Sequence, residues 1–234
     1  MPFIGKKPTA APLTSSDVAD GIITNAKLAQ DIISAETALG ATPADTDELL
    51  ISDAGTLKRI DYSLIKPGFV KLVTTTLGSG ASQIDFDDTY ITTDYLNYLA
   101  VFNCQPATDS VTFNFRVSTS GSFKTGASDY GHGWASDAGD ANDNDRDNLN
   151  LNGTTGNATG ETVSGFIYCF GLTSATYRAK FAYSSHRDTP DGLHGYNTGG
   201  GSVNAGEAHD GIRFYFSSGN VDTSSTITLY GMKE

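Results

Sequence analysis

Five residues within nine positions carry the side chains of acid–base chemistry: His186, Arg187, Asp188, Asp191 and His194. A histidine beside carboxylates could act as a general base. However, the sequence places no serine or cysteine in a nucleophile motif and contains no HExxH segment. Paired carboxylates for glycoside cleavage meet in space rather than in sequence, and nothing here selects a pair. We therefore expect that the protein is not an enzyme.

A second group, in the stretch DNDRDN, has the residue types of a calcium site. Asp143, Asp145 and Asp147 occupy the first, third and fifth places of an EF-hand-type loop. The match then fails, because Asn148 stands where the loop needs glycine and Thr154 where it needs glutamate. The stretch favours a solvated loop, with a weak site for a hard cation as the alternative. No cluster of cysteine and histidine suggests zinc, and we expect no cofactor.

The segment YGHGW groups Tyr130, His132 and Trp134, the last being the only tryptophan. One interpretation is an exposed loop whose tryptophan stacks on a sugar ring. The alternative is a plug that folds back onto the domain beneath. We take as candidate ligand contacts the aromatic and polar side chains of this segment and of the acid–base cluster, namely Tyr130, His132, Trp134, His186, Arg187, His194 and Tyr196.

Charge and hydropathy exclude two classes of partner. The formal net charge is −12, and no run of basic residues is longer than the pair Lys6 and Lys7, so we expect no nucleic-acid binding. No window approaches eighteen apolar residues, and the first twelve residues lack the apolar region of a signal peptide. We expect neither membrane insertion nor signal-dependent secretion.

The elements that position these residues begin at residue 67. Of 12 Phe, 11 Tyr and 1 Trp, only Phe3 and Tyr62 precede it, so the core lies in residues 67–234. Eight segments there are rich in Thr, Tyr, Phe and Val, mostly alternate, and are separated by turn residues. They cover residues 69–77, 82–86, 97–104, 110–120, 163–172, 176–185, 211–218 and 225–233. The pattern predicts a mainly β protein with an antiparallel β-sandwich of the jelly-roll type.

Two stretches without strand patterning interrupt this series, residues 119–160 and 184–210. Both are rich in Gly, Asn and Asp, and together they hold all four histidines. We predict that they are long loops, and loops of this length are usually functional or mobile. The two cysteines, Cys104 and Cys169, lie in apolar strand-like runs and are expected to be buried thiols rather than a disulfide.

The first 66 residues contain few large apolar side chains that could form a core. Residues 1–16 offer one apolar pair, Phe3 and Ile4, so this extended segment is either disordered or laid against another protein. In residues 17–66, the spacing of Leu28, Ile32 and Leu39 matches a coiled-coil seam. A helix this short is marginal alone, so we expect copies of the chain to pack their seams together. Residues 48–60 predict a β-hairpin around Asp53, Ala54 and Gly55.

Several stretches resemble the structural fibre proteins of tailed bacteriophages, particularly those of marine and cyanobacterial hosts. They are MPFIGKKPT, DVADGIITNAKLAQDIIS, ETALGATPADTDELLISDAGTLKRIDYSLI, QPATDSVTFNFRVSTSGSF, GSVNAGEAHDGIRFYFSSGN and the C-terminal IRFYFSSGNVDTSSTITLYGMK. The resemblance covers nearly the whole chain and is most specific at its two ends. In the two stretches that we predict as loops it is weak.

The resemblance implies a non-enzymatic, homotrimeric virion protein that is assembled in the host cytoplasm. Its N-terminus would be held by another virion protein, and a short stem would lead to a jelly-roll head. The head would present its loops to a host-surface glycan or protein. The seven candidate residues named above, chosen from the composition of these loops, are the contacts that we expect. Because this chain has hardly any shaft, a capsid-decoration, tail-collar or baseplate protein without a host ligand is the alternative.

Overall fold

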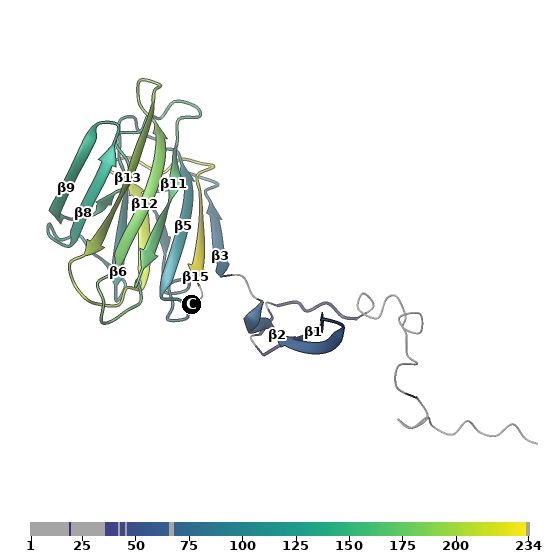
Figure 1. The fold of residues 1–234 in the computed structure, drawn as a ribbon. Coiled ribbons are helices and arrows are strands. Elements are labelled where there is room, and N and C mark those ends of the chain that lie inside the picture. Colours follow the sequence, from purple (N-terminus) through teal and green to yellow (C-terminus); the bar gives the residue numbers. More distant parts are fainter. Residues whose placement is uncertain (1–18, 20–35, 42, 45, 66–67, 233–234) are drawn as a thin grey trace, which may run out of the picture. The chain divides into compact units, whose positions relative to one another are not determined.

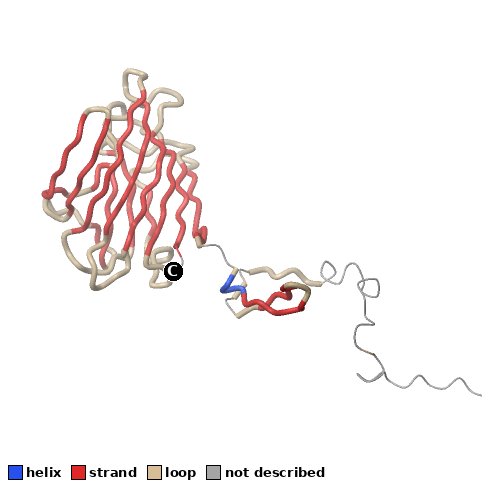
Figure 2. The backbone as a smooth tube through the Cα atoms, in the orientation of Figure 1, coloured by secondary structure: helices blue, strands red, loops and turns tan. Residues whose placement is uncertain are grey.

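The computed structural model describes residues 19, 36–41, 43–44, 46–65 and 68–232. Contacts divide the chain into two units, Met1–Lys66 and Pro67–Glu234. The described residues are mainly β, with antiparallel strand pairing throughout (Figures 1 and 2). The anchor pair Phe3 and Ile4 and the seam residues Leu28 and Ile32 lie outside the described residues.

The first unit contains a β-hairpin at the residues where the sequence predicts one. Strand β1 (Glu48–Asp53) pairs with β2 (Thr56–Asp61) through a two-residue turn, and a 3-10 helix, η3 (Tyr62–Leu64), follows. Both turn residues, Ala54 and Gly55, have positive φ angles of 47° and 87°, which is the geometry that suits a two-residue hairpin. The strands bury none of their side chains, and an isolated hairpin of this kind is marginally stable.

Leu39 differs from its prediction as a seam residue. Residues 36–41 are described and form no helix, and Leu39 is 66% exposed. The predicted helix therefore does not extend to Leu39. The physical reason is that a helix this short gains few backbone hydrogen bonds at its end, too few to keep residues 36–41 helical.

The second unit consists of two antiparallel sheets. In the eight-stranded sheet the order is β3-β15-β5-β11-β12-β13-β8-β9, and Figure 1 shows these strands side by side. In the five-stranded sheet the order is β10-β6-β14-β4, with β7 also paired to β6. The strands are β3 (Phe69–Thr76), β4 (Ile84–Phe86), β5 (Asn97–Cys104), β6 (Phe113–Thr119), β7 (Ser122–Phe123), β8 (Tyr130–Ser136), β9 (Gly139–Arg146), β10 (Leu149–Asn150), β11 (Val163–Phe170), β12 (Lys180–Asp188), β13 (His194–Val203), β14 (Gly211–Phe216) and β15 (Thr226–Met232).

The core lies between the two sheets, which pack face to face as in a β-sandwich. Aromatic rings of one sheet contact those of the other: the centroid distance is 5.2 Å for Phe102 and Phe113, and 5.1 Å for Phe115 and Phe181. Alternate residues of each strand point inward, as in Tyr98, Ala100 and Phe102 of β5. This packing of large apolar side chains is the main source of the unit's stability.

The prediction of long loops at residues 119–160 and 184–210 is wrong. The first stretch contains β7 to β10, and the second contains the end of β12 and all of β13. Glycines allow this pairing: a Cβ on Gly199 would lie 2.4 Å from the carbonyl oxygen of Gly133, and one on Gly201 would lie 2.5 Å from that of Gly131. A glycine inside a strand often marks such a close approach of backbones, although it lowers intrinsic strand propensity.

Both cysteines are buried and free, as predicted. Burial raises the pKa of Cys104 to about 12 and raises that of Cys169 as well, so neither thiol is reactive near neutral pH. Within the described ranges, no helix has the length and apolar character needed to cross a membrane.

Candidate functional site

Tyr130, His132 and Trp134 lie on strand β8 rather than on a loop. Because they are two residues apart, all three point to the inner face of the sheet. Tyr130 is fully buried and accepts a hydrogen bond from the Val117 amide at 2.9 Å. Predicting Tyr130 and His132 as exposed ligand contacts is therefore wrong, since His132 is only 3% exposed.

Trp134 is half-buried and packs against the core. The His132 and Trp134 rings stack at 4.6 Å, and His132 Nε2 lies 2.9 Å from the Tyr183 hydroxyl. Burial lowers the pKa of His132 to about 4, with a smaller contribution from the positive charge of Arg146. These contacts agree with the alternative that the sequence left open, in which the aromatic group packs onto the sandwich.

Arg187 also differs from its prediction as a surface contact. It shares the inner face of β12 with Phe181 and Tyr183, and it is only 7% exposed. Its guanidinium donates to both carboxylate oxygens of Asp137 at 3.0 and 3.1 Å, and to Asn197 Oδ1 at 2.8 Å. Arg187 is thus a structural ion-pair residue.

The other three candidates, His186, His194 and Tyr196, are exposed on the outer face of the eight-stranded sheet, the face directed away from the core. His186 and Tyr196 are cross-strand partners on β12 and β13, and His194 Nδ1 lies 2.9 Å from Asp188 Oδ1. They lie at or beside a shallow pocket of about 280 Å³ that also includes Ser164. The structure therefore brings together three of the seven predicted contacts.

This arrangement does not form a nucleophilic site. Ser164 Oγ donates to Asn103 Oδ1 at 3.0 Å instead of to a histidine. The nine-residue acid–base cluster is divided by the strand, because Arg187 points inward while His186 points outward. These acid–base residues are thus close together in the sequence, but they lie on opposite faces of β12, in the turn that follows it and at the start of β13, so they do not share one catalytic site.

The acidic residues Asp143 and Asp145 lie on β9, and Asp147 follows that strand. Each interacts with a different neighbour: Asp143 with Arg146 at 3.7 Å, Asp145 with Ser128 at 3.0 Å, and Asp147 with Arg116 at 2.5 Å. In the part of the chain that the structure describes, no three His, Cys, Asp or Glu residues are arranged to hold a metal ion.

The outer face of the eight-stranded sheet carries an apolar surface that the sequence analysis missed. We call it the outer apolar face and define it by Leu99 and Val101 of β5, Phe166, Tyr168 and Phe170 of β11, and Tyr230 of β15. Val101 and Phe166 are register partners and are 43% and 39% exposed. The Tyr168 and Phe170 rings stack at 5.8 Å.

A signal for this face was present in the sequence. The runs NYLAVFN and GFIYCF are apolar at consecutive positions, whereas a strand with one solvated face alternates apolar and polar residues. Consecutive apolar residues predict a strand with contacts on both faces.

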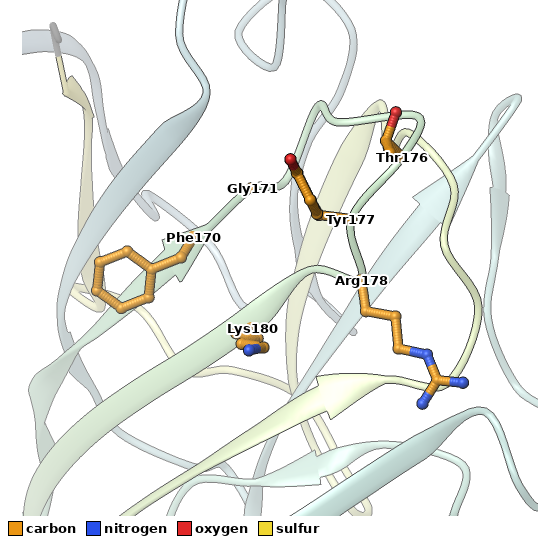
Figure 3. A pocket seen from close by; sticks show the side chains of 6 residues that line it. All are labelled: Phe170, Gly171, Thr176, Tyr177, Arg178 and Lys180. Atoms are coloured by element: carbon orange, nitrogen blue, oxygen red, sulfur yellow. The ribbon is translucent and has the colours of Figure 1, made fainter.

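A pocket of about 420 Å³ lies at the end of β11 and the start of β12. Its lining consists of Phe170, Gly171, Thr176, Tyr177, Arg178 and Lys180 (Figure 3). Because the antiparallel register places Lys180 beside Phe170 and Arg187 beside Val163, this pocket and the His186 pocket lie at opposite ends of the two strands. The sequence analysis placed Thr176, Tyr177 and Arg178 in a strand, whereas β12 begins only at Lys180.

Comparison with known proteins adds no identity to this picture. The chain matches no family model, no curated protein and no solved structure.

Proposed function

We propose that this protein is a structural component of a tailed-phage virion, a short tail fibre or receptor-binding protein that attaches to the host surface. The observation that supports this proposal best is the outer apolar face. Contiguous exposed apolar residues on a soluble sandwich mark an interaction surface. The function is binding rather than catalysis, since the polar clusters in the described residues are engaged in structural contacts.

The order of the strands supports a head of the jelly-roll type. Successive elements cross between the sheets: β3 and β5 belong to the large sheet, while β4 and β6 belong to the small one. The neighbours in space are β3-β15-β5-β11 in one sheet and β10-β6-β14-β4 in the other, so the first and last strands of the unit pair. Eight strands in two Greek keys have this order, and β12, β13, β8 and β9 extend one sheet.

The protein acts as a homotrimer in this proposal. Two apolar surfaces need partners: the outer apolar face, and the hairpin, where Leu50 is 74% exposed and Leu57 69% exposed. Packing against other copies would remove both from water, at about 25 cal/mol per Å² of apolar surface. Residues 1–16, with Phe3 and Ile4, bind another virion protein, and three heads on one stem attach with avidity.

A capsid-decoration, tail-collar or baseplate protein is the second candidate. One observation favours it: between residues 36 and 65 the described chain forms only a hairpin and one turn of 3-10 helix, which makes a very short shaft. Such a protein would carry the same apolar face but would bind only other virion proteins. Binding to host cells separates the two candidates.

The test is adsorption of the labelled full-length protein to cells of the bacterium that the phage infects. We expect saturable binding that blocks adsorption of the phage, and weaker binding of a His186→Ala, Tyr196→Ala double variant, because these exposed side chains lie beside the candidate pocket. A matched control is Leu193→Ala, which changes an exposed side chain in the β12–β13 turn. Absence of binding at any protein concentration would reject the attachment role.

A further inference from the structure

The pocket between β11 and β12 has a fixed frame and an exposed rim. Phe170 and Lys180 are register partners on the two strands, and Tyr177 and Arg178 come from the segment that connects the strands (Figure 3). Tyr177 is 71% exposed and Phe170 is 40% exposed. An open pocket with aromatic and basic walls is suited to a polar ligand that also has apolar faces.

Buried contacts hold the connecting segment in place. The side chain of Leu172 is fully buried, its amide donates to the Leu96 carbonyl at 3.0 Å, and its own carbonyl accepts from the His209 amide at 2.9 Å. The Gly171 amide donates to Asn97 Oδ1 at 2.9 Å. Because the frame is fixed, a ligand would lose little binding energy to ordering of the pocket.

The two cations of the pocket have no carboxylate partner. Neither the Arg178 side chain nor the Lys180 side chain forms an ion pair or a hydrogen bond within the described ranges, although the whole chain carries a net charge of −12. The other described arginines all pair with carboxylates: Arg59, Arg116, Arg146, Arg187 and Arg213. Two neighbouring cations left unpaired in an acidic protein indicate an anionic ligand.

We propose that this pocket binds an acidic saccharide. Its carboxylate or phosphate group pairs with Arg178 and Lys180, since guanidinium and ammonium groups form strong charge-assisted hydrogen bonds to both anions. The apolar C–H face of its ring lies on Tyr177, which does not belong to the outer apolar face. This inference rests on the proposed attachment function and names the ligand class that one site on the head would take.

The experiment uses the full-length protein and four defined probes in ligand-observed NMR. The carboxylate probe is a galacturonic acid trisaccharide, and its control is the matching neutral galactose trisaccharide. The phosphate probe is mannose 6-phosphate, and its control is mannose. We expect one or both acidic probes to bind, their neutral counterparts to bind at least about tenfold more weakly, and added salt to weaken the binding.

Two variants test the pocket and two serve as matched controls. The double variant Arg178→Gln, Lys180→Gln and the single variant Tyr177→Ala should each lower affinity for the acidic probe about tenfold. Lys71→Gln removes a third unpaired cation, which lies on β3 and is separated from β12 by β15, β5 and β11. Leu193→Ala removes an exposed apolar side chain in the turn between β12 and β13, at the end of β12 opposite to the pocket. Neither control should change the affinity. All five substituted residues are exposed, so thermal unfolding should stay the same.

The inference is overturned if neither acidic probe binds, if the neutral probes bind equally well, or if Lys71→Gln weakens binding as much as the pocket variants do. Cell adsorption then separates this inference from the proposed function. If the pocket variants adsorb to cells as well as the wild-type protein does, the acidic-saccharide site is rejected and the attachment function stands. Probe binding without any adsorption to cells would reject attachment and leave the site standing.

Discussion

Arg187 binds both carboxylate oxygens of Asp137 at 3.0 and 3.1 Å, which joins strand β12 to the turn between β8 and β9. The two side chains differ in environment, because that of Arg187 is 6% exposed and that of Asp137 is 38% exposed. Strand β13 lies between the elements that they connect. The ion pair thus ties β8 and β9, at one edge of the large sheet, to β12.

We predict that Asp137→Asn destabilises the head by about 2 kcal/mol, because it leaves the buried Arg187 charge without its carboxylate; the half-exposed position of Asp137 reduces the cost below that of a fully buried pair. The measurement is urea unfolding followed by tryptophan fluorescence. Asp143→Asn is the matched control, since its partner Arg146 is 3.7 Å away and the pair is partly solvated. Equal effects of the two substitutions would contradict a special role for Arg187.

The effect of Asp137→Asn should depend on pH. Burial acts to raise the pKa of Asp137, but the Arg187 charge and the Tyr196 amide hydrogen bond outweigh it and lower that pKa below 3.8. The folded state therefore holds the proton more weakly than the unfolded state, and the stabilisation present above pH 3.8 is lost as pH falls through the folded-state pKa. The difference in unfolding free energy between wild type and variant should shrink there.

His132 gives a second pH dependence in a different window. Burial lowers its pKa from 6.5 to about 4, so between these values the unfolded state binds more protons than the folded state. Unfolding free energy should fall as pH drops through this window, by about 3 kcal/mol for this one group. A His132→Gln variant should show a correspondingly smaller fall. The same slope in both proteins would show that His132 is accessible to protons in the folded state.

Gly195 should tolerate no larger side chain. A Cβ at this position would lie 2.6 Å from the guanidinium carbon of Arg187. We expect Gly195→Ala to cost about 1–3 kcal/mol of unfolding free energy, because the crowded site must shift. Gly78→Ala, where no atom lies within 4 Å of the added Cβ, is the control and should be nearly neutral. A neutral Gly195→Ala would mean that Arg187 can adopt another position without loss.

The strands of the sandwich could be predicted where alternation and β-branched or aromatic residues coincide, as in β5 and β14. Residues 130–136 and 194–203 could not, because Gly131, Gly133 and Gly199 to Gly201 lower strand propensity, and their pairing depends on neighbouring backbones. Intrinsic preference is a weak guide where tertiary contacts decide the structure.

The candidate contacts show the same limit. Because residues 130–136 form a strand, alternation directs the side chains of Tyr130 and His132 inward. The exposed-loop interpretation placed the same side chains in solvent. His186 and Tyr196 remained exposed because β12 and β13 direct them outward. By contrast, the unpaired cations Arg178 and Lys180 could not be recognised from sequence, since a missing partner becomes visible only when all neighbours are placed.

The outer apolar face should control association. Replacing Phe166→Asp places a charge in the middle of that face, and we predict that it converts trimers into monomers without lowering the stability of the head. The measurement is light scattering of the full-length protein, with an expected wild-type mass of three times the 24.6 kDa chain. Leu193→Asp, at an exposed turn, should leave the trimer intact. A Phe166→Asp variant that remains trimeric would place the interface elsewhere.

The most direct test of the proposed role is the number of copies of this chain per virion, determined by quantitative mass spectrometry of purified phage particles. A short tail fibre or receptor-binding protein predicts a few copies, in a multiple of three, because trimers occupy a limited number of tail positions. Tens or hundreds of copies per particle would contradict the attachment role and identify a protein that covers the capsid.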